Sequence, residues 1–156
     1  MPDSLMVEYS GTIRQPIEIV SRQFGDIPHH AKHSVHPDIT FVVLSDRRNV
    51  CHFTQEVRLL GLKQKDEVMQ KRRADGNLES EVIEGTNKGM KIFQSFQSQG
   101  PNATTIKLRV EAPATGIKKL LKGFFKAAVL RTVRKAFEQD RVDLEERGYP
   151  RRAATV

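Results

Sequence analysis

The sequence predicts an α+β fold in which a curved antiparallel sheet of about seven strands wraps around a long C-terminal helix. Three observations support this prediction. The stretch 115–148 has no internal proline and is dominated by strong helix formers. Most of the preceding chain instead alternates apolar and polar residues, which is the period of half-buried strands. Turn signals such as Asp75-Gly76-Asn77 separate these alternating runs, and such turns join antiparallel neighbours.

The first part of the chain predicts one strand followed by two short helices. Leu5 to Ile13 alternates apolar and polar side chains, as a half-buried strand does. Pro16 then stands where the first turn of a helix accepts a proline, and Gly25 ends that helix. Asp26 and Pro28 have the places of the N-cap and first turn of a second helix. This second helix carries four histidines, and Pro37 is expected to close it.

Six further strands are expected before the C-terminal helix, each bounded by glycine, proline, asparagine or aspartate. Their predicted ranges are 39–44, 50–60, 62–73, 78–84, 90–98 and 104–111. At 156 residues the chain has the usual length of one domain. We therefore expect a single domain over 1–156, with strands and short helices in 5–112 and the C-terminal helix in 115–148.

Composition and charge restrict the possible partners. The formal net charge of +7 favours anionic partners such as acidic lipid surfaces, nucleic acid or anionic ligands, although a basic surface also serves solubility. Nucleic acid is not the expected partner, because no helix-turn-helix, zinc finger or aromatic RNA-binding motif is present. We also expect no cofactor, since neither a P-loop nor a GxGxxG motif occurs. The lone Cys51 excludes an intrachain disulfide and fits a reducing cytoplasm, where we expect the protein.

Two short motifs and the order of elements resemble a known superfamily. The motifs are Gln15-Pro16-Ile17-Glu18-Ile19-Val20 and the segment from Asp26-Ile27-Pro28 through His36-Pro37-Asp38-Ile39. They resemble the START-like superfamily, which is also called Bet v 1-like, SRPBCC, or polyketide cyclase/dehydrase and lipid-transport. The resemblance implies a helix-grip fold with a ligand cavity between the sheet and the long helix. His33 to His36 stand where a Trp is common in the family, a difference that would alter the mouth of this pocket.

Strand parity assigns side chains to the implied cavity, because successive side chains on a strand point to opposite faces. The inner face of 62–73 is unusually polar for a core, and glutamines also fall on the inner faces of 50–60 and 90–98. A buried polar group without a partner costs ~1–3 kcal/mol, so a ligand or trapped water would be needed there. Alternatively, a bulge shifts the register, or these residues lie at the open end of the sheet. The predicted ligand-binding residues are Gln55, Gln64, Asp66, Val68, Gln70, Gln94, Phe96, Leu120 and Phe124.

Two groups of residues are candidates for chemistry. Asp66 could act as a general acid or base if an apolar cavity raised its pKa, although no second catalytic partner is specified nearby. His29, His33 and His36 follow the spacing i, i+4, i+7, and imidazoles one turn apart can bind zinc or copper. The simpler interpretation of the histidines is an exposed polar rim without a metal.

The long helix does not keep one apolar face along its length. Its first half has an apolar side formed by Ile117, Leu120, Leu121, Phe124, Ala127 and Ala128. The second half has its apolar side roughly opposite, formed by Val129, Leu130, Val133, Ala136, Phe137 and Leu144. One straight helix cannot press both sides on one sheet, so it breaks near Gly123, or the first half directs its apolar side elsewhere.

Four lysines form the other side of the first half, namely Lys118, Lys119, Lys122 and Lys126. Positive charge in the first turns opposes the helix dipole, so these lysines do not serve helix stability. The segment could contact an acidic membrane surface or another anion, gate the cavity mouth, or form a homodimer contact. It could also be a helix start with solvated lysines.

The leading hypothesis from the sequence is a non-enzymatic protein that binds or carries a hydrophobic or amphipathic small molecule, such as a lipid, quinone or polyketide-like compound. The first alternative is a cyclase or dehydratase that uses Asp66 on a polyketide-like substrate. The second alternative is a basic module that contacts an acidic membrane or nucleic acid.

Overall fold

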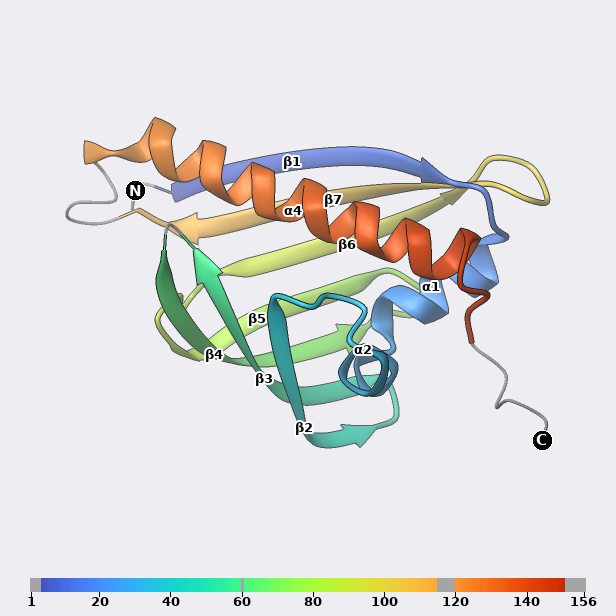
Figure 1. Cartoon of the computed structure of the whole chain (residues 1–156), viewed down its shortest axis with the longest axis horizontal. Helices are drawn as coiled ribbons and strands as arrows, with labels where there is room; N and C mark the ends of the chain where they lie inside the picture. The colour runs from blue at the N-terminus through green and yellow to red at the C-terminus, as the bar shows by residue number, and fades with distance from the viewer. Residues whose placement is uncertain (1–3, 60, 115–119, 151–156) are drawn as a thin grey trace.

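The structure is a computed structural model that describes residues 4–59, 61–114 and 120–150. Its seven strands form one antiparallel sheet in the order β1-β7-β6-β5-β4-β3-β2. The sheet curves around α4, and α1 and α2 close the end near the C-terminal part of α4 (Figure 1). This arrangement confirms the predicted α+β helix-grip fold. The elements are β1 (Ser4–Ile13), α1 (Ile17–Gly25), α2 (Ile27–His33), β2 (Ile39–Arg47), β3 (Val50–Leu59), β4 (Leu62–Arg72), β5 (Leu78–Gly85), β6 (Lys91–Ser98), β7 (Thr104–Pro113) and α4 (Lys122–Glu145).

The start of α2 agrees with the sequence, but its end does not. The Asp26 side chain caps the helix by accepting a hydrogen bond from the backbone N–H of His29 at 3.2 Å. The helix ends at His33, because Ser34 turns into the left-handed region at φ 49°. The predicted end at Pro37 is therefore wrong. His36 lies outside the helix, so it does not continue a helical face with the earlier histidines.

The predicted alternation of inward and outward side chains is confirmed on most strands. On β4 the buried residues are Gln64, Asp66, Val68 and Gln70. A β-bulge interrupts the pairing of β4 with β5 between Glu67 and Val68, yet the alternation along β4 continues through it. The same alternation buries Leu78, Ser80 and Val82 on β5, and Ile106, Leu108 and Val110 on β7.

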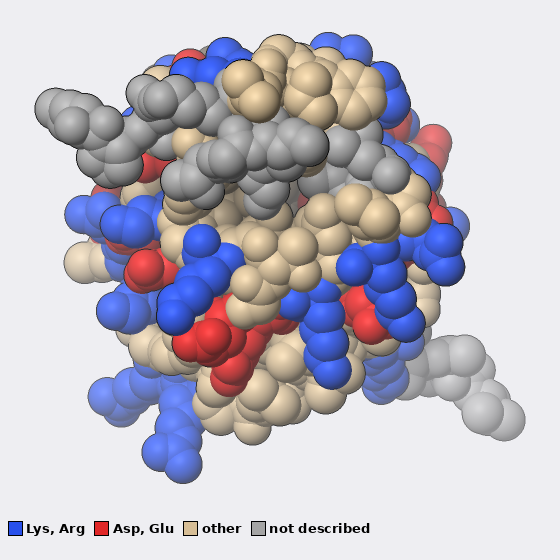
Figure 2. Space-filling view, turned by 90° about the vertical axis from the view of Figure 1, so that its left-hand side faces the viewer, with Lys and Arg blue, Asp and Glu red and all other residues tan. Residues whose placement is uncertain are grey.

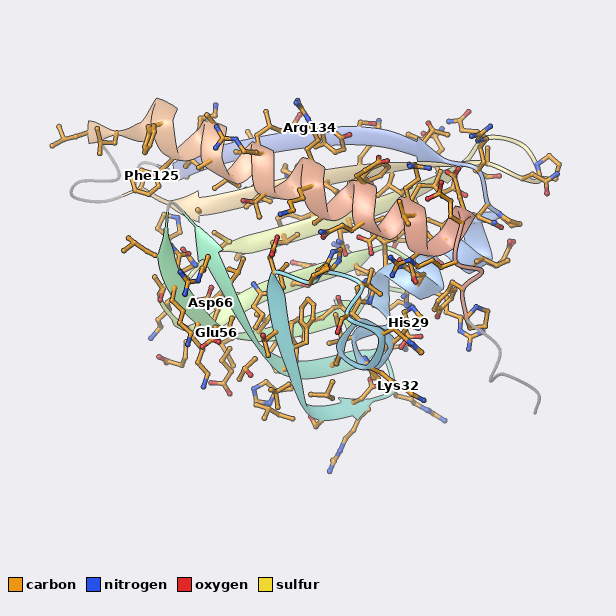
Figure 3. The ribbon with its side chains drawn as sticks, in the orientation of Figure 1. His29, Lys32, Glu56, Asp66, Phe125 and Arg134 are labelled. Atoms are coloured by element: carbon orange, nitrogen blue, oxygen red, sulfur yellow. The ribbon has the colours of Figure 1, made fainter. Side chains whose placement is uncertain are left out.

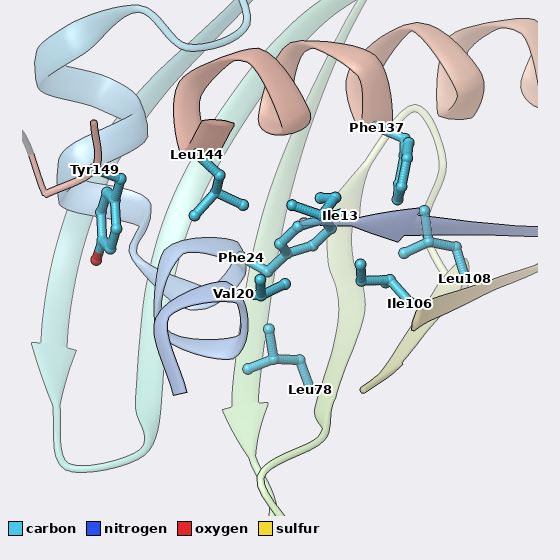
Figure 4. Close-up of a cluster of buried hydrophobic side chains, with 9 residues drawn as sticks. All are labelled: Ile13, Val20, Phe24, Leu78, Ile106, Leu108, Phe137, Leu144 and Tyr149. Carbon is cyan, nitrogen blue, oxygen red and sulfur yellow. The ribbon is translucent and has the colours of Figure 1, made fainter. Parts of the chain in front are cut away.

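The main core cluster joins the C-terminal half of α4 to β1 and α1 (Figure 4). Phe137 is central to it and meets the Tyr9 ring edge to face, with 5.3 Å between ring centroids. Gly11 on β1 makes room for this ring, since a Cβ atom at residue 11 would lie 2.5 Å from Cζ of Phe137. The members of the cluster are Ile13, Val20, Phe24, Leu78, Ile106, Leu108, Phe137, Leu144 and Tyr149.

The long helix is shorter than predicted, and its two halves have different environments. α4 ends at Glu145 rather than at Gly148, and residues 115–119, with Ile117, Lys118 and Lys119, lie outside the described residues. The second half buries Phe137 and Leu144 in the core, as predicted. Leu120 and Phe124 are instead 84% and 60% exposed, so this part of the apolar side points away from the sheet, whereas Ala128 of the same side is buried. None of the helices within the described ranges is long and apolar enough to cross a membrane.

Candidate functional site

A cavity of about 170 Å³ lies between the inner face of the sheet and α4. Apolar side chains form most of its wall, while amides from the sheet and a carboxylate from α4 supply polar groups. This position agrees with the cavity that a helix-grip fold implies. Its lining residues are Phe24, Ile27, His30, His36, Ile39, Phe41, Phe53, Gln55, Val68, Gln70, Ser80, Ile92, Gln94, Leu108, Val110, Val133, Ala136 and Asp140.

A larger hollow, which we call the vestibule, has a volume of about 330 Å³ and lies between α4 and the β2–β3 edge. Cavity and vestibule share Ile39 and Ala136 in their walls, so the vestibule lies directly outside the cavity. Arg58, Arg131 and Lys135 give the vestibule a cationic wall.

Four of the predicted ligand-binding residues line the cavity together, namely Gln55, Val68, Gln70 and Gln94. The Gln70 amide donates a hydrogen bond to the carbonyl oxygen of Gly25 at 3.0 Å, so it is partly engaged. The side-chain amides of Gln55 and Gln94 form no hydrogen bond with another described residue. These two amides are therefore available to a ligand.

Gln64 and Asp66 face inward on β4 but lie outside the cavity wall. Oδ1 of Asp66 accepts the backbone N–H of Asn87 at 2.8 Å, and Oδ2 accepts its side-chain amide at 2.7 Å. The same amide donates to Oε1 of Gln64 at 2.8 Å. The two β4 residues thus hold the turn between β5 and β6, at the end of the sheet opposite His29 (Figure 3). The structure gives Asp66 a role in the fold, and its catalytic role stays a prediction.

The three remaining predicted residues also lie away from the cavity. Phe96 packs edge to face on Phe24, with 5.6 Å between ring centroids, at the margin of the core cluster. Leu120 and Phe124 are exposed at the start of α4, beside the exposed Lys122 and Lys126.

The histidine segment is largely buried, so its interpretation as an exposed rim is wrong. His29, His30 and His36 are all buried and face α4. His30 and His36 line the cavity together with Asp140 of α4. The sequence predicted a group of His29, His33 and His36. The cavity is instead lined by His30 and His36, and neither His29 nor His33 is among its lining residues.

Both cavity histidines direct Nε2 toward one carboxylate oxygen. His30 Nε2 lies 2.9 Å from Oδ1 of Asp140, and its Nδ1 donates to the carbonyl oxygen of Asp26 at 2.8 Å. His36 Nε2 lies 3.3 Å from the same Oδ1, and its Nδ1 donates to Oε1 of Gln139 at 2.8 Å. The two rings stack with centroids 5.1 Å apart.

A second buried carboxylate lies next to this group. The Gln23 amide nitrogen donates to Oδ1 of Asp140 and to Oδ2 of Asp143, both at 3.0 Å. Oδ2 of Asp143 also lies 2.7 Å from Nε2 of His29. Oε1 of Gln23 is buried without a hydrogen-bond partner among the described residues. The polar network therefore links α1, α2 and α4 beneath the cavity wall.

The network shifts the pKa of two of its members in opposite directions. Burial alone would raise the pKa of Asp140, but the charge of His36 and hydrogen bonds from both cavity histidines hold it well below its usual range. Burial alone would lower the pKa of His36, but the Asp140 carboxylate and the hydrogen bond to Gln139 outweigh burial and raise it. Both shifts favour the charged forms that attract each other.

Sequence reasoning missed Asp140, although a signal for it was present. Phe137, Asp140 and Leu144 recur at i, i+3 and i+7, so they share one face of α4. A carboxylate on the apolar face of a helix needs a buried partner, because an unpaired buried charge is very costly. Buried histidines were the obvious partners, since a neutral or charged imidazole can donate to a carboxylate.

No protein-family model and no curated protein matches the sequence. Solved structures do match, and several of them do so over nearly their whole length. A protein from Thermus thermophilus has 14% identity and a TM-score of 0.82, with 92% of this chain and 99% of that chain covered. An aromatase/cyclase from a Streptomyces species has 13% identity and a TM-score of 0.76, with 94% and 99% covered. A START superfamily protein from Mycobacterium smegmatis has 16% identity and a TM-score of 0.72, with 89% and 98% covered. These likenesses confirm the expected START-like fold.

Proposed function

We propose that the protein binds an amphipathic small molecule, such as a lipid, quinone or polyketide-like compound, beneath α4. The observation that carries this proposal is the apolar cavity with two unpaired amides, Gln55 and Gln94. Both amides are half-buried and line the cavity, so a ligand that accepts or donates hydrogen bonds there gains affinity and orientation. The cavity of about 170 Å³ is smaller than the ~300–1,000 Å³ of typical ligand pockets. The ligand would therefore extend into the vestibule.

The charge of the vestibule favours an anionic or strongly polar head group. Arg58, Arg131 and Lys135 come from β3 and α4 and face the same hollow. Lys135 forms an ion pair with Asp38, which precedes β2, so this pair spans the vestibule. Exposed ion pairs contribute only ~0–1 kcal/mol, so a ligand can open this one at little cost.

Catalysis is an alternative function for the same cavity, because a solved aromatase/cyclase has the same fold. A cyclase or dehydratase needs an acid or base that reaches the substrate. Asp66 is hydrogen-bonded to Asn87 and does not line the cavity, so it does not reach a substrate there. His30, His36 and Asp140 do line the cavity. Turnover of a polyketide-like substrate that is lost in His30→Ala with the fold retained would favour the enzyme over the carrier.

The binding proposal is tested by filling the junction of cavity and vestibule. Ala136 lines both hollows, so Ala136→Phe should block access to the cavity. Ala127→Phe is the matched control, since residue 127 is exposed on the same helix. Anilinonaphthalene sulfonate, an apolar anion, should bind the native protein and the control, and its fluorescence should fall at least tenfold with Ala136→Phe. Native mass spectrometry of freshly purified protein should show a co-purified ligand. Equal probe binding by all three proteins would refute the proposed site.

A second candidate function is contact with an acidic membrane surface through the start of α4. The exposed Leu120, Leu121 and Phe124 lie beside Lys122 and Lys126, which is the pattern of a segment that lies in the membrane interface. Lys and Arg side chains spread over this end of the molecule, with a smaller group of acidic side chains among them (Figure 2). A membrane contact here would place the cavity near a source of lipid.

Vesicle flotation tests the membrane candidate. The protein should float with phosphatidylcholine vesicles that contain phosphatidylserine, and less with phosphatidylcholine alone. Leu120→Ser combined with Phe124→Ser should abolish flotation, and Lys122→Gln with Lys126→Gln should weaken it. If the serine variant floats like the native protein, the membrane contact is excluded. Dimer loss in the serine variant would identify the surface as a homodimer contact instead.

A further inference from the structure

Three buried donor groups in the cavity wall converge on one point. The Nε2 atoms of His30 and His36 lie 2.9 Å and 3.3 Å from Oδ1 of Asp140. The ligand atoms of the three residues all lie within 4.8 Å of one another. Nitrogen and oxygen ligands that share one ion at ~2.1 Å lie roughly 3.0 Å apart in octahedral sites and 3.4 Å apart in tetrahedral sites. The two nitrogen–oxygen spacings, 2.9 Å and 3.3 Å, are therefore those of ligands that share one metal ion.

The ring orientation of both histidines is fixed as in metal sites. The Nδ1–H of His30 donates to the Asp26 carbonyl, and that of His36 donates to Oε1 of Gln139, each at 2.8 Å. Histidine ligands of metals almost always donate the other ring N–H to a carbonyl or carboxylate, which fixes the tautomer with the metal-facing lone pair. Here both rings have that tautomer available, with Nε2 directed at Asp140.

The charge of the cluster also fits a divalent cation. Both Nε2 atoms are directed at one oxygen of a buried carboxylate, Oδ1 of Asp140. Asp140 and Asp143 together balance a charge of two, and the Gln23 amide holds the two carboxylates side by side.

The three residues leave part of a coordination sphere open toward the cavity, because all of them line it. Two imidazoles and one carboxylate with an open position are the donor set of catalytic zinc sites and of non-haem iron sites. We propose that His30, His36 and Asp140 bind one divalent transition-metal ion, zinc or ferrous iron, whose open coordination position faces the cavity. This inference rests on the donor geometry alone and stands whether or not an amphipathic molecule binds beneath α4.

Titration of the chelator-treated full chain tests the site. Calorimetry with Zn²⁺ should show one equivalent with a dissociation constant on the order of 1 μM or tighter. Co²⁺ should give visible absorption bands that report its coordination number, and Zn²⁺ should remove them. Anaerobic Fe²⁺ should compete for the same equivalent. His36→Ala should lose at least tenfold in affinity, and His52→Ala, a histidine paired with Glu67 outside the cluster, should bind like the native protein.

Substitution of Gln139, which positions His36, tests the site even if substitution of a metal-binding residue disturbs the fold. Gln139 is only half-buried and holds His36 through Nδ1, so Gln139→Ala should fold normally and bind Zn²⁺ roughly 10–100-fold more weakly. Gln139→Glu keeps an acceptor and should restore the affinity. Unchanged circular dichroism in both variants would confirm that the fold is intact. Absence of a stoichiometric Co²⁺ spectrum in the native protein, or native affinity for Zn²⁺ in both His36→Ala and Gln139→Ala, would overturn the proposal.

Discussion

The two halves of α4 should contribute very differently to stability, and two phenylalanines on this one helix measure the difference. Phe137 is 4% exposed and packs against Tyr9 over Gly11, whereas Phe124 is 60% exposed. Phe137→Ala removes a buried ring and leaves a cavity, which costs ~3–5 kcal/mol in the free energy of unfolding. Phe124→Ala removes an exposed ring, and its effect should stay within roughly 0.5 kcal/mol. For a domain of this size, the buried substitution lowers Tm by about 10 °C.

Urea unfolding followed by far-ultraviolet circular dichroism measures both variants under one set of conditions. The native protein and both variants should give similar slopes of free energy against urea, so the midpoints report stability directly. If the two substitutions differ by less than about 1 kcal/mol, the assignment of the core anchor to the second half of α4 is refuted. A large loss with Phe124→Ala would mean that the first turns pack on the domain, which would also exclude them as a free membrane contact.

Further predictions concern single sites. Asp66→Ala should lower the free energy of unfolding by ~1–3 kcal/mol, because the Asn87 donors lose their acceptor. Probe binding in the cavity should stay unchanged. Loss of probe binding in a folded variant would show that Asp66 belongs to the ligand site. Burial raises the pKa of the Cys51 thiol to about 11, so the thiol stays protonated at pH 8 and should react with a disulfide reagent far more slowly in native protein than in urea; equal rates would contradict its burial. Zn²⁺ at 100 times its dissociation constant should stabilise the protein by ~2.7 kcal/mol in a melting experiment, and His36→Ala should not respond. Gly85→Ala should strongly destabilise the protein, since Gly85 has φ +119° and a Cβ would lie 2.3 Å from the Lys65 carbonyl oxygen. The control Gly123→Ala on α4 brings its Cβ near no other atom and should not destabilise the protein. Similar stability of the two variants would refute the close approach at Gly85.

The sequence by itself determined the fold and the direction of most strand side chains. Alternation has a period of two along a strand, so a burial pattern read from residues such as Gln64, Val68 and Gln70 transfers directly to the sheet. The opposite apolar sides of the two halves of α4 were also readable, because a helix has a fixed period. The exposure of Leu120 and Phe124 agrees with one of the two outcomes that this wheel left open, although the sequence also placed both residues among the ligand-binding candidates.

Only the tertiary structure decided which inward groups share a site. Asp66 and Gln70 have the same parity on β4, yet one holds the turn at Asn87 and the other lines the cavity, since position along a strand is set by the whole sheet. The local pattern around His30 and His36 gave no indication of Asp140, which is more than a hundred residues away in the chain. Packing of α2 on α4 brings these residues together, and a buried carboxylate binds its partners through space, whatever their separation in the sequence.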